Sequence, residues 1–216
     1  MRQLLLISSI VGMLMYAGYV SQGGVPVGDT SDGRPELSVL QTALESAGAT
    51  LNEVTVTAWG EVPQTSSLKT ARRALAWDGP SPAGELRELQ VSTRHGQQFL
   101  TLRWVLKGSA MSTWNAKLQM AMSALPEAGI KVEWTVQVSG QATVDPPEIS
   151  VARALGAVSA TGLQPWSGPR SASLAGHTAK LPARATGVNI QAAARQDPIR
   201  KVSTVWVAWP ALLQEY

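Results

Sequence analysis

Apolar and polar residues alternate with a period of two along residues 53–60, EVTVTAWG, and again along residues 133–140, EWTVQVSG. In each stretch valines alternate with threonine, serine or glutamine, which is the pattern of a strand that buries one face. Glu, Thr, Val and Gly occupy the same four places in both stretches. The sequence therefore predicts two related β-strands.

Each of these strands stands in a similar context. Leu37, Leu40, Leu44 and Ala47 share one face of a predicted helix that ends at Gly48, immediately before the first strand. The segment STWNAKLQMAMSALPEAG, before the second strand, has the same Leu-Gln pair and the same Ala-Gly ending. A second helical segment follows each strand, TSSLKTARRALA after the first and DPPEISVARALG after the second. A helix-strand-helix unit is thus predicted to occur twice.

Further strands complete each unit. Residues 85–94 and 97–107 flank His95-Gly96 and predict a β-hairpin, because glycine tolerates a positive φ in the turn. GVNIQAAAR and KVSTVWVAW predict a second hairpin. Residues 162–186 are rich in Gly, Pro and Ser, so we expect one irregular strand there and otherwise loop. The fold class is predicted to be α+β, with two related halves.

The first twenty residues have the features of an export segment. Arg2 precedes an uncharged apolar run from Leu4 to Val20, whose length lies between a long signal peptide core and a short membrane span. Either a cleaved signal peptide or an N-terminal anchor is expected, with the rest of the chain extracytoplasmic. The chain is then expected to comprise residues 1–21 (signal peptide or membrane anchor), 22–34 (flexible linker), 35–129 (first half) and 130–216 (second half).

Composition narrows the function. Hydrophobic residues make up 44% of the 216 residues, enough for a core, and the net charge of +3 is too small for a dedicated polyanion binder. Residues 147–216 carry 7 Lys and Arg against 3 Asp and Glu, which favours an anionic partner or a solvated basic face. The absence of cysteine excludes disulfides and thiolate metal sites.

No catalytic or metal-binding motif stands out, so no catalytic residue, metal or cofactor is predicted. His95 and His177 have no second ligand at helical spacing. Ser66 and Lys69 match S-x-x-K, which gives a Ser/Lys hydrolase as one alternative, although Ser66 also suits a helix cap. The protein is expected not to be an enzyme.

Two other residue types invite functional interpretations. Glu53 and Glu133 occupy matching places in the repeat, and glycosidases use two carboxylates. Eight of the twelve aromatic residues are tryptophan, which can anchor a core or stack on sugars and bases. Trp206 and Trp209 are predicted to lie on opposite faces of the last strand, so one of them is a candidate for binding.

The exported N-terminus, the Ala-Gly helix endings and the tryptophan-bearing strands together resemble the YwmB family of Gram-positive bacterial proteins. The resemblance implies a fold similar to the TATA-box-binding protein: a curved antiparallel sheet with helices on one face, made of two pseudo-symmetric halves. Such a fold does not itself carry DNA binding, which in that protein uses pairs of intercalating Phe. Phe99 is the only Phe here, so binding of nucleic acid through the sheet is kept only as an alternative.

The face of the sheet without helices is the candidate binding surface. We expect it to be polar, exposed and sparsely basic, and to contact an envelope protein or an anionic cell-wall polymer. The side chains predicted to form it are Thr55, Thr57, Arg103, Lys107, Gln137, Ser139, Asn189 and Gln191.

Overall fold

The computed structural model describes residues 36–63, 68–143, 145–184 and 186–210. The fold is α+β, as the sequence predicts. No helix in these residues has the length and apolar character needed to cross a membrane, and the predicted export segment lies outside them. In chain order the elements are α2 (Ser38–Ser46), β1 (Ala49–Val62), α3 (Leu68–Ala74), β2 (Glu85–Arg94), β3 (Gln97–Lys107), the 3-10 helix η1 (Gly108–Thr113), α4 (Trp114–Glu127), β4 (Glu133–Thr143), α5 (Pro147–Ala157), β5 (Thr161–Gly168), β6 (Ser171–His177), β7 (Ile190–Asp197) and β8 (Val202–Trp209).

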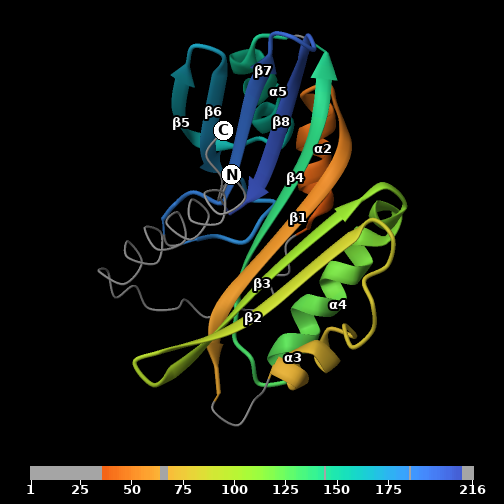
Figure 1. Cartoon of the computed structure of the whole chain (residues 1–216). Helices are drawn as coiled ribbons and strands as arrows, with labels where there is room; N and C mark the ends of the chain where they lie inside the picture. Colours follow the sequence, from red (N-terminus) through yellow and green to blue (C-terminus); the bar gives the residue numbers. More distant parts are fainter. Residues whose placement is uncertain (1–35, 64–67, 144, 185, 211–216) are drawn as a thin grey trace.

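The strands form one curved antiparallel sheet in the order β2-β3-β1-β4-β8-β7-β6-β5 (Figure 1). The two strands that contain the repeated phrase, β1 and β4, are neighbours at its centre. Both predicted hairpins are present, β2–β3 with its turn at His95 and Gly96, and β7–β8. The helices lie on one face, where leucines of α2 and α4 join the valines of the central strands in a single core.

The two halves are related by a pseudo-two-fold axis that passes between β1 and β4. In the β1–β4 register Val56 lies opposite Val136, and these two valines are equivalent in the repeat. The axis also relates Trp104, opposite Val56 on β3, to Trp209, opposite Val136 on β8. The duplication therefore extends beyond the repeated phrase to the strands on either side of it.

Each repeated unit begins at the helix before its central strand, α2 before β1 and α4 before β4, and this first helix packs on the other unit. α2 contacts α5 and β8, and α4 contacts α3 and lies beside β2 and β3 (Figure 1). The pairing of β1 with β4 joins the two units in one sheet, and the exchanged helices join them in one core.

The glycines of the repeat have a steric cause. A Cβ at Gly60 would collide with the backbone oxygen of Lys131, and a Cβ at Gly140 would collide with that of Thr50. Each glycine thus lies where the neighbouring central strand begins and the two backbones come too close for a side chain. The phrase is repeated because the same close approach occurs on both sides of the axis.

One prediction is wrong. Residues 162–186 contain most of a hairpin, β5–β6, whose register shifts once between Thr161 and Gln164, rather than one irregular strand. The Gly and Pro content led to the prediction of a loop, although both residue types fit this hairpin. Pro165 lies on β5, the outermost strand, where a missing backbone donor is tolerated. Gly176 of β6 lies against Leu163 and Thr161 of β5.

Candidate functional site

The candidate binding surface predicted from the sequence is the face of the sheet opposite the helices. The registers place Thr55 and Thr57 of β1, Arg103 and Lys107 of β3, Gln137 and Ser139 of β4, and Gln191 of β7 on this outer face. Both halves of the sheet contribute to this face, so Arg103 and Gln191, which are 88 positions apart in the sequence, both belong to it. Seven of the eight predicted residues therefore share one face.

Their exposure differs from the prediction. Thr55, Thr57, Gln137 and Ser139 are each less than 10% exposed. A physical reason is that these side chains lie on the two central strands, β1 and β4, with a neighbouring strand on both sides: Thr57 lies between Arg103 and Thr135, for example. The hydroxyl oxygen of Thr57 is buried and has no hydrogen-bond partner among the described residues.

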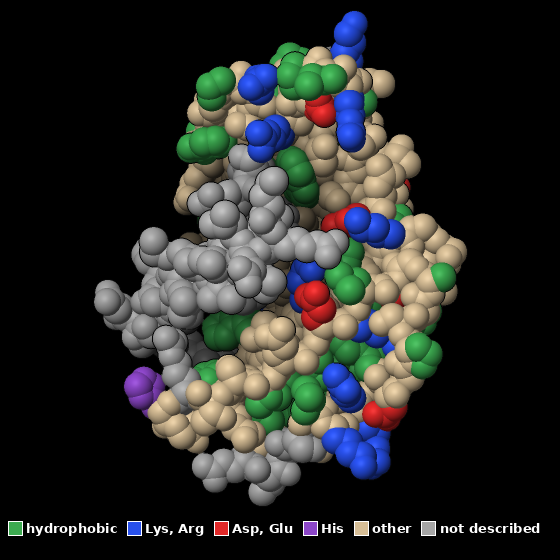
Figure 2. Space-filling model, in the orientation of Figure 1, with side chains coloured by type: hydrophobic (Ala, Val, Ile, Leu, Met, Phe, Trp, Pro, Cys, Tyr) green, Lys and Arg blue, Asp and Glu red, His purple; other side chains and the backbone are tan. Residues whose placement is uncertain are grey.

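Two basic side chains of β3 project from this face. Lys107 Nζ lies 2.6 Å from Glu53 Oε2, and Arg103 Nη1 lies 3.3 Å from Glu88 Oε2. Both cations are substantially exposed, so these ion pairs contribute little to stability. On the face shown in Figure 2, Lys and Arg side chains are dispersed among the described residues and form no continuous basic patch.

Asn189 does not contribute to the outer face. Its side chain is fully buried, accepts a hydrogen bond from the backbone N–H of Thr178 at 2.8 Å and donates to the carbonyls of Thr178 and Leu181. It also donates to the carbonyl of Pro182. The prediction of a surface role is wrong because these contacts use the amide to hold the loop between β6 and β7.

The other candidates from the sequence form no catalytic arrangement in the described residues. Glu53 lies opposite Ser139 and Glu133 opposite Trp59, so the two carboxylates are six strand positions, roughly 20 Å, apart along β4. Glycosidase carboxylates lie within about 10 Å of each other. Ser66 lies outside the described residues, so the Ser/Lys alternative has no geometry to test.

The histidines and carboxylates do not gather either. His95 is in the β2–β3 turn and His177 ends β6. In the described part of the chain no three His, Asp or Glu side chains come close enough to hold a metal ion.

A buried ionic cluster, which is not among the sites predicted above, lies on the helix side of the first half. The carboxylate of Glu85, on β2, is completely buried and forms an ion pair with Lys117 of α4. Arg87 Nη2 lies 2.7 Å from Glu85 Oε2, and the indole nitrogen of Trp104 donates to the same oxygen at 3.2 Å. The guanidinium of Arg87 also lies 5.5 Å from the ring centre of Trp77.

The electrostatics of this cluster favour the ionised carboxylate. Burial raises the pKa of Glu85, but the hydrogen bonds from Lys117, Arg87 and Trp104 and the charge of Arg87 together hold that pKa below its ordinary value. The cluster joins β2, β3 and α4, so it fastens the exchanged helix to the edge of the sheet.

The sequence does contain a clue to this cluster. In ELRELQV the period of two places Glu85 and Arg87 on the same face as Leu89 and Val91. A charged pair on an otherwise apolar face indicates an internal ion pair.

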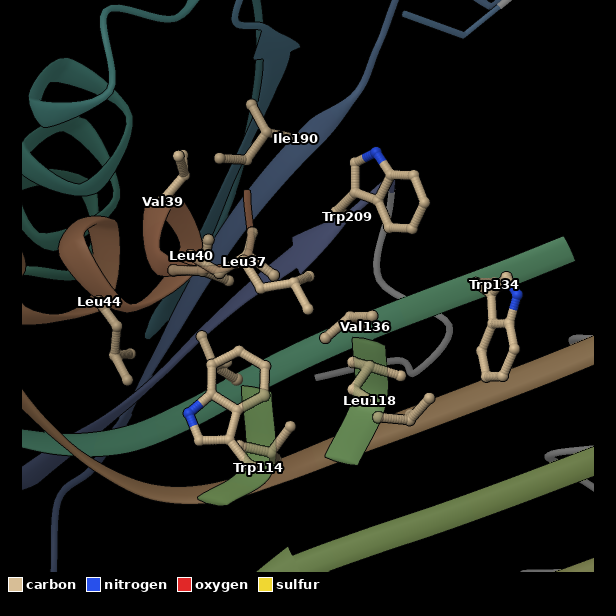
Figure 3. Close-up of a cluster of buried hydrophobic side chains, with 14 of the residues drawn as sticks. Leu37, Val39, Leu40, Leu44, Trp114, Leu118, Trp134, Val136, Ile190 and Trp209 are labelled. Atoms are coloured by element: carbon tan, nitrogen blue, oxygen red, sulfur yellow. The ribbon is translucent and has the colours of Figure 1, made fainter. Parts of the chain in front are cut away.

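A second buried tryptophan lies in the other half. Trp209 is 4% exposed, and the guanidinium carbon of Arg184 lies 4.8 Å from the centre of its ring. The indole nitrogen of Trp209 and Nε of Arg184 are both buried, and neither has a hydrogen-bond partner among the described residues. Figure 3 shows the indole nitrogen on the edge of the ring remote from Leu37 and Leu40.

A groove of about 850 Å³ lies between α2, the start of β1, η1 and the start of α4. Leu51, Met111 and Trp114 form its apolar lining, and Gln41 and Asn115 are among its polar residues. Among the described residues that line it, none is ionisable.

Comparisons with known proteins do not assign this chain to a family. No family model matches the chain, and no curated protein matches it. The regulatory subunit of aspartate kinase from Thermus thermophilus, in its ligand-free form, is 12% identical, with a TM-score of 0.25; the match covers 76% of this chain and 89% of that one. A Bacillus cereus protein related to NIF3 is also 12% identical, with a TM-score of 0.24, over 60% of this chain and 43% of that one. Likenesses this weak carry no argument about function.

Proposed function

We propose that the protein is a non-catalytic binding module of the bacterial cell envelope, and that it contacts an envelope protein or anionic cell-wall polymer through the outer face of its sheet. The observation that supports this most directly is the hydroxyl of Thr57, at the centre of that face, which is buried and lacks a hydrogen-bond partner among the described residues. Native folds rarely leave a buried polar group unsatisfied, so this hydroxyl marks the outer face as a place that packing alone does not explain.

Charge and sequence support the same proposal. Arg103 and Lys107 are exposed beside the central strip of Thr, Gln and Ser, so this face offers two cations to an anionic group. The apolar N-terminal run and the resemblance to exported YwmB proteins place this module outside the cytoplasm in the proposal.

Site-specific photo-crosslinking of the full chain in cells tests the proposed surface. A photoreactive amino acid at Lys107 reports on the outer face, and the same residue at Lys180, an exposed position in the loop after β6, is the matched control. We expect adducts with envelope material at position 107 and none at position 180. Equal labelling at both positions, or none at 107, would remove the outer face from the proposal.

Substitutions then test how contact is made. Thr57→Val removes the hydroxyl at nearly constant volume, and Arg103→Gln removes one cation without placing two acids together. Both are expected to weaken crosslinking at position 107, while Lys180→Gln is expected to leave it unchanged. If partner contact survives the combined Thr57→Val and Arg103→Gln change, the chemistry proposed here is wrong.

A further inference from the structure

Two tryptophans at equivalent positions in the two halves of the sheet differ in their hydrogen bonding. Trp104 lies opposite Val56, and Trp209 lies opposite Val136, so the pseudo-two-fold axis relates one to the other. Both are almost completely buried, at 3% and 4% exposed. The contrast therefore lies in the hydrogen bonding of their indole N–H groups and not in their depth.

In the first half a carboxylate satisfies the indole. Trp104 donates to Glu85 Oε2, and Arg87 forms an ion pair with the same oxygen. The β2–β3 register places Arg87 opposite Trp104, which puts Glu85 two residues earlier on β2. One carboxylate thus accepts from an indole and a guanidinium together.

In the second half no described residue supplies such a carboxylate at the equivalent position. The β7–β8 register, continued one step from the pair Gln191 and Ala208, places Ile190 opposite Trp209. Two residues earlier, at the position equivalent to Glu85, the chain has Val188. A guanidinium is nevertheless present, because Arg184 stacks on the ring of Trp209.

We propose that Trp209 and Arg184 form a binding site for the carboxylate of a ligand. Both offer a buried donor that lacks a partner among the described residues, Nε1 of the indole and Nε of the guanidinium. These groups lie on stacked side chains, and a carboxylate has two oxygens with which to accept from neighbouring donors. The first half provides the chemical precedent, since Glu85 fills the same role for Trp104.

The ligand is a small organic acid or the carboxylate of a peptide. Arginine pairs well with planar carboxylates, and burial of the indole excludes water that would otherwise compete for the donor. The site is separate from the outer face of the sheet, because Trp209 belongs to the core on the helix side. Its failure would leave the proposed outer surface untouched.

Indole N–H signals of the 15N-tryptophan-labelled full chain, in detergent micelles, measure binding directly. Trp209→Phe and Trp104→Phe assign the two signals. On titration with acetate we expect the Trp209 signal to move and saturate while the Trp104 signal stays in place, and we expect no movement with sodium chloride at equal ionic strength. No saturable movement of the Trp209 signal, or equal movement of both signals, would overturn the proposal.

Substitutions of arginine test whether the guanidinium of Arg184 takes part in acetate binding. Arg184→Gln is expected to weaken acetate binding about tenfold or more, as for loss of a hydrogen bond to a charged group. Arg195→Gln changes an exposed arginine of β7 and is the control that should bind normally. Unchanged affinity in Arg184→Gln would contradict the site.

Val188→Glu provides a second, independent test. It restores the carboxylate found in the first half, so we expect a well-dispersed spectrum, a displaced Trp209 signal and no further response to acetate. A Val188→Glu chain that stays folded and still binds acetate normally would overturn the assigned position.

Short peptides distinguish the two sources of carboxylate. A peptide with a free C-terminal carboxylate that binds more tightly than acetate, and loses this advantage when amidated, assigns the site to a chain end. Equal affinity for acetate and the free peptide assigns it to small acids.

Discussion

Removing the buried charge of Glu85 should destabilise the protein strongly. Glu85→Gln keeps the volume of the side chain and an oxygen for Trp104, but it leaves Arg87 and Lys117 without their anion. Loss of one partner of a buried pair costs about 3–5 kcal/mol. Because the side chain of Lys117 is 34% exposed and can turn to water, we expect the lower end, about 3 kcal/mol.

The matched control is Glu88→Gln, three residues further along the same strand. The ion pair of Glu88 with Arg103 is exposed on both sides, at 46% and 41%, so its loss should cost less than about 1 kcal/mol. Thermal and denaturant unfolding measure both variants. About 3 kcal/mol corresponds to a fall in Tm of roughly 6–12 °C for a protein of this size.

The effect should also depend on pH with a definite sign. The pKa of Glu85 is lower in the folded protein than its ordinary value of 4.5, so its ionised form stabilises the fold at neutral pH. This stabilisation is lost as the pH falls through 4.5 towards the lowered pKa. The difference in Tm between the wild type and Glu85→Gln should therefore hold from neutral to mildly acidic pH and shrink below 4.5. Similar stability of Glu85→Gln and Glu88→Gln, or a difference independent of pH, would refute this reasoning.

Three further predictions concern backbone and core. Gly140→Ala should lower the free energy of unfolding by about 1–3 kcal/mol, measured with denaturant, because its Cβ meets the neighbouring backbone. Gly156→Ala, in α5 with open space around it, should raise the free energy of unfolding by up to about 1 kcal/mol. Equal effects of the two changes would contradict the steric argument. Asn189→Ala should cost about 2–4 kcal/mol and raise hydrogen exchange in the β6–β7 loop, since buried backbone groups lose their partner; unchanged exchange would count against it. In the absence of added carboxylate, Trp104→Phe should cost about 1 kcal/mol more than Trp209→Phe by the same unfolding assay, because only the first indole has a hydrogen bond to lose; equal costs would contradict that asymmetry.

Much of the fold follows from local pattern. The period of two identifies β1 and β4, and in β3 the same period groups Leu100, Leu102 and Trp104 on one face, which is buried in the core. The Ala-Gly helix endings are equally informative, because Gly48 and Gly129 both adopt φ of +76° after their helices. Such features depend on nearest neighbours in the chain, which a sequence displays directly.

Other features depend on contacts that no local pattern records. The burial of Thr55 and Gln137 on the outer face arises from neighbouring strands, and the role of Asn189 arises from a loop that folds back over it. The cluster at Glu85 requires Lys117, which comes from the helix exchanged between the halves. The alternation of side chains along β2 predicts that Glu85 lies on the inner face, but it does not predict that α4 brings Lys117 into contact with it.

The duplication itself indicates where specialised function lies. Some positions retain the same residue in both halves because the same steric constraint occurs on both sides of the axis. Gly60 and Gly140, for example, both lie too close to the neighbouring backbone to carry a Cβ. A residue that differs at equivalent places, such as Glu85 and Val188, is free of that constraint. The first half uses its carboxylate to close a buried ionic cluster, and the second keeps the indole and a guanidinium without one. In a chain whose scaffold is symmetric, recognition of a partner is best sought where the symmetry is broken.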